Sequence, residues 1–169
     1  MIVVDTNIIA YLYLPTDLTG QAERLLESDP EWAVPVLWRS EFRNVLALYL
    51  RKGLISLAEA VRVQEEAEAL LKDHEYMSVS PDVLRLVNES SCSAYDCEFV
   101  ALARSHGVKL VTMDRKILVD FPDTAVSLEE AVNSACGRDL PAPWITEYGL
   151  SPHPSLLPGH GVPCPYCIS

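Results

Sequence analysis

Two kinds of hydrophobic pattern alternate along the chain. Short runs of consecutive apolar and often β-branched residues are typical of strands buried in a parallel sheet, and they occur at 2–4, 32–36, 109–113 and 125–128, with a further extended piece at 76–80. Between these runs, apolar residues recur every three or four positions, which predicts helices over 7–14, 18–28, 37–53, 56–74, 81–90, 93–107 and 128–135. This alternation predicts an α/β fold around a parallel sheet.

Residues at the segment ends agree with these boundaries. Gly53 and Gly107 follow helical patterns and are expected to end them, and Ser56 and Ser93 stand where helix N-caps are expected. Pro35 lies within an apolar run, which indicates either the end of a strand or an edge strand, because proline cannot donate a ladder hydrogen bond.

The pattern stops after Cys136. The last 33 residues, 137–169, hold seven of the chain's 12 prolines and show neither helical nor alternating periodicity. We therefore expect one folded domain over 1–136, followed by a Pro-rich extension that either wraps around the domain or stays extended.

The amino-acid composition indicates what class of protein this is. Of 169 residues, 49% are hydrophobic and 22% are charged, which is the balance of a globular domain. No apolar run approaches the roughly 20 residues needed to cross a bilayer, and no basic segment precedes the first apolar run. Five cysteines in this context indicate thiols. We expect a cytoplasmic protein.

The formal net charge of −11 argues against a protein that holds nucleic acid by bulk electrostatics, since phosphate contacts come from Lys and Arg. It leaves open a site that reaches phosphates through divalent cations. The acidic excess therefore belongs either to a solvated surface or, in part, to a cluster of carboxylates.

Two carboxylates stand at the carboxyl ends of predicted strands. Asp5 follows the first apolar run, and Asp114 follows the run KLVTM. Ligands of open parallel sheets bind in the crevice beyond the strand ends, so the pair points to one shared location. For each residue alone, helix N-capping is an equally good explanation.

Two further acids lie on predicted helices. Glu41 falls within an apolar stripe, where a carboxylate is costly to bury unless it is paired, hydrogen-bonded or bound to metal. An ion pair with Arg39 or Arg43 is the structural alternative. Asp96 follows Ser93 at the spacing of a capping box, a role that leaves one oxygen free for another partner.

Four acids gathered at one place would repel one another unless a cation neutralises them. Oxygen ligands of this number suit Mg²⁺ or Mn²⁺, which can polarise a phosphodiester and generate hydroxide. Arg39, Arg43, Arg115 and Lys116 flank the expected pocket, where they either contact phosphates or pair with the acids.

The segments VVDTN, RSEFRNVL, AYDCEFVALA and LVTMD, in this order, resemble the PIN-domain ribonucleases, and among them the VapC-type toxins. The resemblance covers residues 1–135 and implies an α/β/α sandwich and metal-dependent hydrolysis of RNA. It also implies a homodimer and a partner antitoxin. The metal ligands that it implies are Asp5, Glu41, Asp96 and Asp114, supported by Asn7 and Thr112.

Other functions remain to be weighed. A phosphatase with Asp5 as nucleophile calls for a second aspartate two residues later, where Asn7 stands. A catalytically idle PIN-like binding module is the other alternative, and the presence of all four acids argues against it. In the extension, a zinc site is a further hypothesis, resting on His153, His160, Cys164 and Cys167.

Overall fold

The computed structural model describes residues 1–135 and is built on one parallel sheet. Its strands are β1 (Ile2–Val4), β2 (Trp32–Pro35), β3 (Glu75–Tyr76), β4 (Leu110–Val111) and β5 (Ala125–Val126). Their order across the sheet is β3-β2-β1-β4-β5, and every neighbouring pair is parallel. The zinc hypothesis and the expected extension fall outside the described residues.

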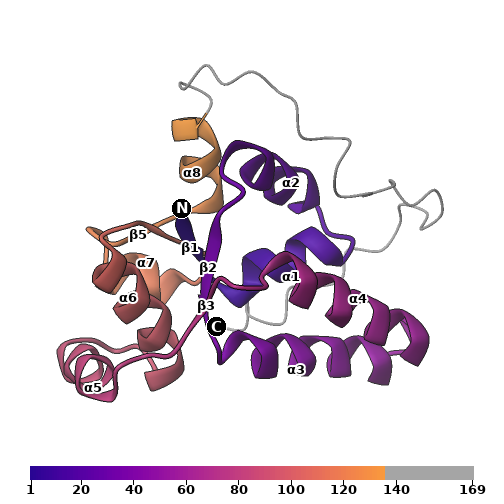
Figure 1. Ribbon diagram of the computed structural model, residues 1–169, viewed down its shortest axis with the longest axis horizontal. Helices are drawn as coiled ribbons and strands as arrows, with labels where there is room; N and C mark the ends of the chain where they lie inside the picture. The colour runs from indigo at the N-terminus through magenta and orange to yellow at the C-terminus, as the bar shows by residue number, and fades with distance from the viewer. Residues whose placement is uncertain (136–169) are drawn as a thin grey trace.

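Helices cover both faces of the sheet, which confirms the predicted three-layer α/β/α sandwich (Figure 1). One face carries α1 (Thr6–Tyr13), α2 (Thr19–Ser28), α3 (Trp38–Arg51) and α4 (Leu57–Leu70); the other carries α5 (Ser80–Glu89), α6 (Ala94–His106) and α7 (Arg115–Asp120). α8 (Leu128–Ala135) packs beside α2. No helix within residues 1–135 has the length and apolar character needed to cross a membrane.

The two faces follow from the order of the strands. From β1 the chain moves outward through β2 to β3, and it then returns to the other side of β1 for β4 and β5. Because crossovers between parallel strands are almost always right-handed, reversing the direction moves the connecting helices to the opposite face. The reversal occurs between β1 and β4, the point of such a sheet where ligands bind beyond the strand ends.

Most of the predicted segment ends are confirmed. Gly53 and Gly107 adopt left-handed φ angles of 66° and 65°, and Ser56 and Ser93 cap α4 and α6. Pro35 is the last residue of β2, which lies inside the sheet, so the strand-end alternative was right and the edge alternative was wrong. The sequence pattern did not predict α7, because six residues are too few to show helical periodicity.

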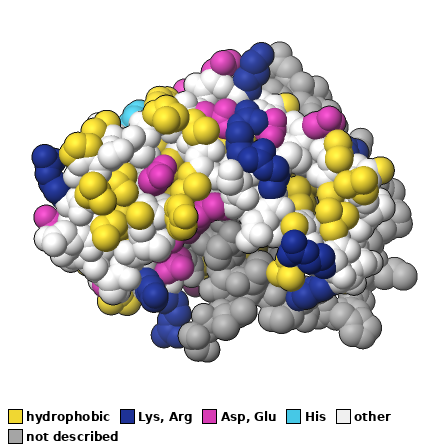
Figure 2. Space-filling view, turned by 90° about the horizontal axis from the view of Figure 1, so that it is seen from below, with side chains coloured by type: hydrophobic (Ala, Val, Ile, Leu, Met, Phe, Trp, Pro, Cys, Tyr) yellow, Lys and Arg dark blue, Asp and Glu magenta, His cyan; other side chains and the backbone are white. Residues whose placement is uncertain are grey.

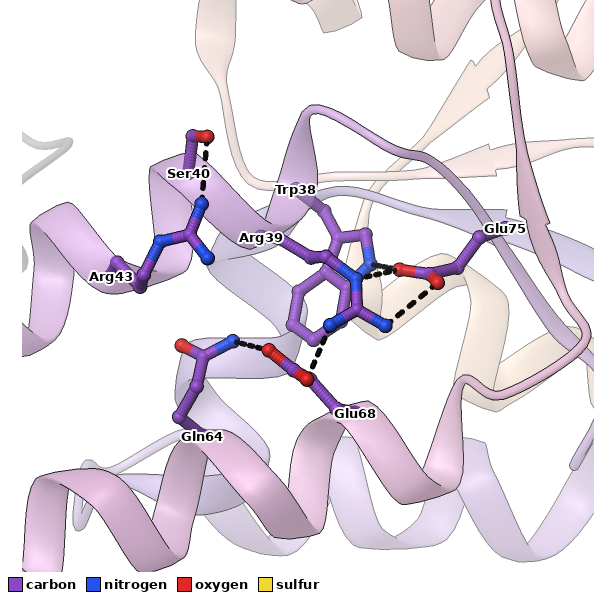
Figure 3. Close-up of polar contacts among 7 residues, drawn as sticks. All are labelled: Trp38, Arg39, Ser40, Arg43, Gln64, Glu68 and Glu75. Atoms are coloured by element: carbon purple, nitrogen blue, oxygen red, sulfur yellow. Dashed lines mark hydrogen bonds and ion pairs between the residues drawn. The ribbon is translucent and has the colours of Figure 1, made fainter.

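Arg39 ties the start of α3 to its surroundings (Figure 3). Its Nε and Nη2 donate to the two carboxylate oxygens of Glu75 at 2.7 and 2.9 Å, and its Nη1 forms an ion pair with Glu68 of α4. Trp38 Nε1 donates to the same carboxylate of Glu75 at 2.5 Å. Arg39 therefore holds α3 against β3 and α4, and it does not pair with Glu41.

Replacing Arg39 with methionine is expected to lower the free energy of unfolding by about 1–3 kcal/mol, because Glu68 and Glu75 lose a partly buried, bidentate partner. Urea denaturation measures the change. Arg62→Met is the control, since the pair that Arg62 forms with Glu66 one helical turn away is exposed, and it should cost less than about 0.5 kcal/mol. Equal costs for the two variants would contradict the structural role of Arg39.

Candidate metal centre

Asp5 lies at the carboxyl end of β1 and is the N-cap of α1. Its side chain is 9% exposed. Oδ2 accepts hydrogen bonds from Asn7 Nδ2 at 2.8 Å and from the hydroxyl of Thr112, while Oδ1 faces the backbone N–H of Asn7 at 3.5 Å. Asp5 is thus both a helix cap and a buried carboxylate at the reversal point of the sheet.

The environment of Asp5 disfavours its charge. Burial raises the pKa of Asp5 from 3.8 to about 6, and the hydrogen bonds from Thr112 and Asn7 offset only part of this increase. Repulsion from Asp96 and Asp114 makes a smaller contribution to the same raised pKa. The two acids from other elements therefore lie close enough to Asp5 to affect its ionisation.

Asn7 and Thr112 connect the two central strands at this point. Besides its bond to Asp5, Asn7 Nδ2 lies 3.3 Å from Thr112 Oγ1, and the backbone N–H of Met113 donates to Asn7 Oδ1 at 3.4 Å. Thr112 Oγ1 also accepts from the backbone N–H of Asp114 at 2.9 Å. This network holds the segment after β1 against the segment after β4, and so fixes Asp5 relative to Asp114.

Glu41 approaches from the first turn of α3. Its Oε2 accepts a hydrogen bond from Thr6 Oγ1 at 2.6 Å. Arg39 pairs with Glu68 and Glu75, and Arg43 Nη2 donates to Ser40, so the ion-pair alternative for Glu41 was wrong (Figure 3).

Burial is the largest cause of the raised pKa of Glu41, which moves from 4.5 to about 7. The hydrogen bond from Thr6 lowers this pKa, whereas repulsion from Asp5, Asp96 and Glu98 raises it. Glu41 and Asp5 therefore each lie near the other acids. In both residues, burial and repulsion disfavour the charged form of the carboxylate.

Asp96 and Asp114 are helix-capping residues, as their positions predicted. Asp96 Oδ2 accepts from the backbone N–H and hydroxyl of Ser93 at 2.9 and 2.8 Å, which completes the capping box of α6. Asp114 Oδ1 accepts from the backbone N–H groups of Lys116 and Ile117 at 2.7 and 3.3 Å. Capping occupies a single oxygen of each carboxylate.

The second carboxylate oxygen of Asp96, Asp114 and Glu41 indicates what the site can bind. Asp96 Oδ1, Asp114 Oδ2 and Glu41 Oε1 accept no hydrogen bond from any residue within 1–135. A carboxylate held at one oxygen and open at the other is suited to binding a hard cation, and these donors match the preference of Mg²⁺ and Mn²⁺ for oxygen. The donor set fits such an ion.

The four carboxylates do not converge on a single metal position in this structure. Within the described part of the chain, no group of three or more His, Cys, Asp or Glu side chains is gathered closely enough to hold a metal ion as it stands. Mutual repulsion between the carboxylates favours this separation, and a cation bound among them would offset the repulsion. Figure 2 looks onto the edge where the strands end and shows acidic side chains there between areas of hydrophobic ones.

Two polar residues of this region were missed by the sequence analysis. Thr6 contacts Glu41, and Glu98, two residues after Asp96, accepts a hydrogen bond from Ser78 at 3.0 Å and repels Glu41. Each of the two lies within two residues of a predicted ligand in the sequence, and this proximity could have identified them as site residues. The exposed side chains of Arg115 and Lys116 open α7 directly after Asp114, at the rim of the site.

The chain is similar to known proteins in both sequence and fold. The PIN domain family matches residues 2–124. The chain is 36% identical to Ribonuclease VapC3 of Pyrobaculum aerophilum over 124 residues, which cover 72% of this chain and 95% of that protein. The crystal structure of PAE2754 from Pyrobaculum aerophilum has the same fold, with a TM-score of 0.65 and 23% identity over 80% of this chain and 96% of that one.

Proposed function

The chain belongs to the PIN-domain family, and from this premise we propose that it is a metal-dependent endoribonuclease of the VapC type. The observation that carries the proposal is the arrangement of carboxylates at the reversal point of the sheet, three of which have one oxygen that accepts no hydrogen bond from residues 1–135. The 36% identity to a protein named as a ribonuclease supports RNA as the substrate class.

The proposed ligands of Mg²⁺ or Mn²⁺ are Asp5, Glu41, Asp96 and Asp114. When bound, such an ion activates water at neutral pH and stabilises negative charge on the leaving oxygen of a phosphodiester. The pKa values of Asp5 and Glu41 are raised chiefly by burial and further by repulsion from neighbouring acids, and a bound cation would offset that repulsion. The acidic net charge is then no obstacle to RNA binding, because the cation supplies the positive charge.

The remaining residues hold these ligands and contact the substrate. Asn7 and Thr112 orient Asp5 through hydrogen bonds to its Oδ2, a supporting role that residues around metal ligands commonly have. We propose that Arg115 and Lys116, exposed beside Asp114, contact phosphates of the RNA. The proposed reaction is hydrolysis by water that leaves a 5′-phosphate on one product.

The biological role follows from the same relationship. We propose that the protein is the toxin of a toxin–antitoxin pair, that a cognate antitoxin covers the site, and that the toxin acts as a homodimer in the cytoplasm. The catalytically idle binding module is the alternative that the next experiment distinguishes.

The test measures Mn²⁺ binding by calorimetry and cleavage of a labelled RNA in the same buffer, for the wild type and Asp96→Asn. Asparagine keeps an oxygen that can accept the capping hydrogen bonds from Ser93 while the negative charge is lost. We expect wild-type binding, an affinity at least about tenfold weaker in the variant, and cleavage reduced by roughly a hundredfold.

Glu59→Gln is the matched control. Glu59 completes the capping box of α4 by accepting from Ser56 at 2.7 Å, at the far end of the α3–α4 hairpin from the site. Its replacement should change neither Mn²⁺ affinity nor cleavage. If the wild type binds no divalent ion at millimolar concentration, the four acids serve as caps and hydrogen-bond acceptors, and the chain is a binding module.

A further inference from the structure

Thr6 is the first residue of α1 and is completely buried. Threonine hydroxyls inside helices usually donate to the carbonyl one turn earlier. Thr6 has no helical turn before it, so its hydroxyl is available to another element. It donates to Glu41 Oε2 at 2.6 Å, across 35 residues of sequence and between the packed helices α1 and α3.

This hydrogen bond is the attractive polar contact that the described residues provide to the Glu41 carboxylate. The acids Asp5, Asp96 and Glu98 also lie near Glu41, and each of them repels its carboxylate. Glutamate has three rotatable side-chain bonds, and a partly buried carboxylate repelled from several directions turns towards water unless a donor holds it. The hydroxyl of Thr6 is that donor.

We propose that Thr6 is a positioning residue of the metal centre, whose hydroxyl holds Glu41 at Oε2 and thereby leaves Oε1 free to bind the cation. The inference rests on the proposed function, because it assigns Glu41 to the metal. It gives each residue of the tripeptide 5–7 its own task. Asp5 is a ligand, Thr6 holds the ligand from α3, and Asn7 holds Asp5 against Thr112 after β4.

The experiment titrates Mn²⁺ into the metal-free full-length protein by calorimetry. Thr6→Val keeps the shape of the side chain and removes the donor, and we expect its Mn²⁺ affinity to fall by about tenfold, within the range found when residues that orient metal ligands are removed. Thr6→Ser restores the hydroxyl and should recover affinity to within about twofold of the wild type. Thr6→Ala, which cannot overpack the site, is the second variant if valine prevents folding.

Two controls separate positioning from a general structural effect. Thr124→Val removes another buried hydroxyl, one that accepts from Arg104 at the amino end of β5, and should leave Mn²⁺ affinity unchanged. In a Glu41→Gln background, Thr6→Val should produce no further loss, because its effect passes through Glu41.

The outcomes distinguish the inference from the function on which it rests. If the wild type binds Mn²⁺ and Thr6→Val binds it equally well, the positioning role is overturned and the metal site stands. A full tenfold loss on adding Thr6→Val to Glu41→Gln also overturns it, since Thr6 would then act by another route. If the wild type binds no Mn²⁺, both proposals fail together.

Discussion

Replacing Asp5 with asparagine is expected to reduce RNA cleavage by roughly a thousandfold or more, and at the same time to stabilise the metal-free protein at pH 8. The loss of activity follows from the position of Asp5, the most buried of the four proposed ligands. Several kcal/mol of charge stabilisation in the transition state depend on a bound ion, and each 1.4 kcal/mol corresponds to about tenfold in rate.

The gain in stability has a different cause. At pH 8 the carboxylate of Asp5 is ionised in a buried site that raises its pKa to about 6, so folding carries a penalty for its charge. Asparagine removes the charge, and its carbonyl oxygen can still accept the hydrogen bonds from Asn7 and Thr112. Opposite changes in activity and stability are typical of residues kept for function.

Cleavage of a labelled RNA and urea denaturation in the presence of EDTA measure the two effects on one preparation. Asp17→Asn, at an exposed position in the α1–α2 connection, is the control and should alter neither quantity. An Asp5→Asn variant that retains cleavage within tenfold of the wild type would remove Asp5 from the catalytic site.

The stability of the metal-free protein is expected to fall as the pH rises from about 5 to 8, and Mn²⁺ is expected to reverse this trend. Asp5 and Glu41 have folded-state pKa values of about 6 and about 7, above their ordinary values of 3.8 and 4.5. At these two groups the folded protein thus binds more protons than the unfolded chain between about pH 4 and pH 7, so Asp5 and Glu41 lower the free energy of unfolding as the pH rises across this window.

The size of the effect is set mainly by Asp5. A shift of about two pKa units corresponds to about 3 kcal/mol, and Glu41 adds less than its own shift indicates because it is partly exposed. Glu75, Asp120 and Glu130 have lowered pKa values because hydrogen bonds favour their ionised forms, and they contribute the opposite slope at more acidic pH. Maximum stability without metal should therefore lie near pH 5.

Urea denaturation at half-unit pH steps, with EDTA or with millimolar Mn²⁺, measures this prediction. An ion that binds only the folded state at one hundred times its dissociation constant stabilises by about 2.7 kcal/mol, and it binds best when the acids are ionised. Asp5→Asn should flatten the slope measured in EDTA. A metal-free protein that is more stable at pH 8 than at pH 5 would contradict the electrostatic description of the site.

Local patterns were sufficient for much of the fold. Short apolar and often β-branched runs predicted the strands at their observed places, and a serine cap or a glycine after a helix acts through neighbouring backbone groups alone. Ser56, Ser93, Gly53 and Gly107 therefore have the roles that their sequence positions predicted. The capping bonds of Asp96 span three residues and were predictable for the same reason.

Contacts between distant segments were decided only by the tertiary structure. The residue pattern alone was enough to predict that Asp5 and Asp114 follow buried strands and that Glu41 lies on an apolar helix face. That Glu41 meets Thr6, while Arg39 turns to Glu68 and Glu75, depends on how α3 packs against α1, α4 and β3. These partners lie 29 to 36 residues apart and are selected by the packing of whole elements, and local hydrophobic periodicity carries no information about that choice.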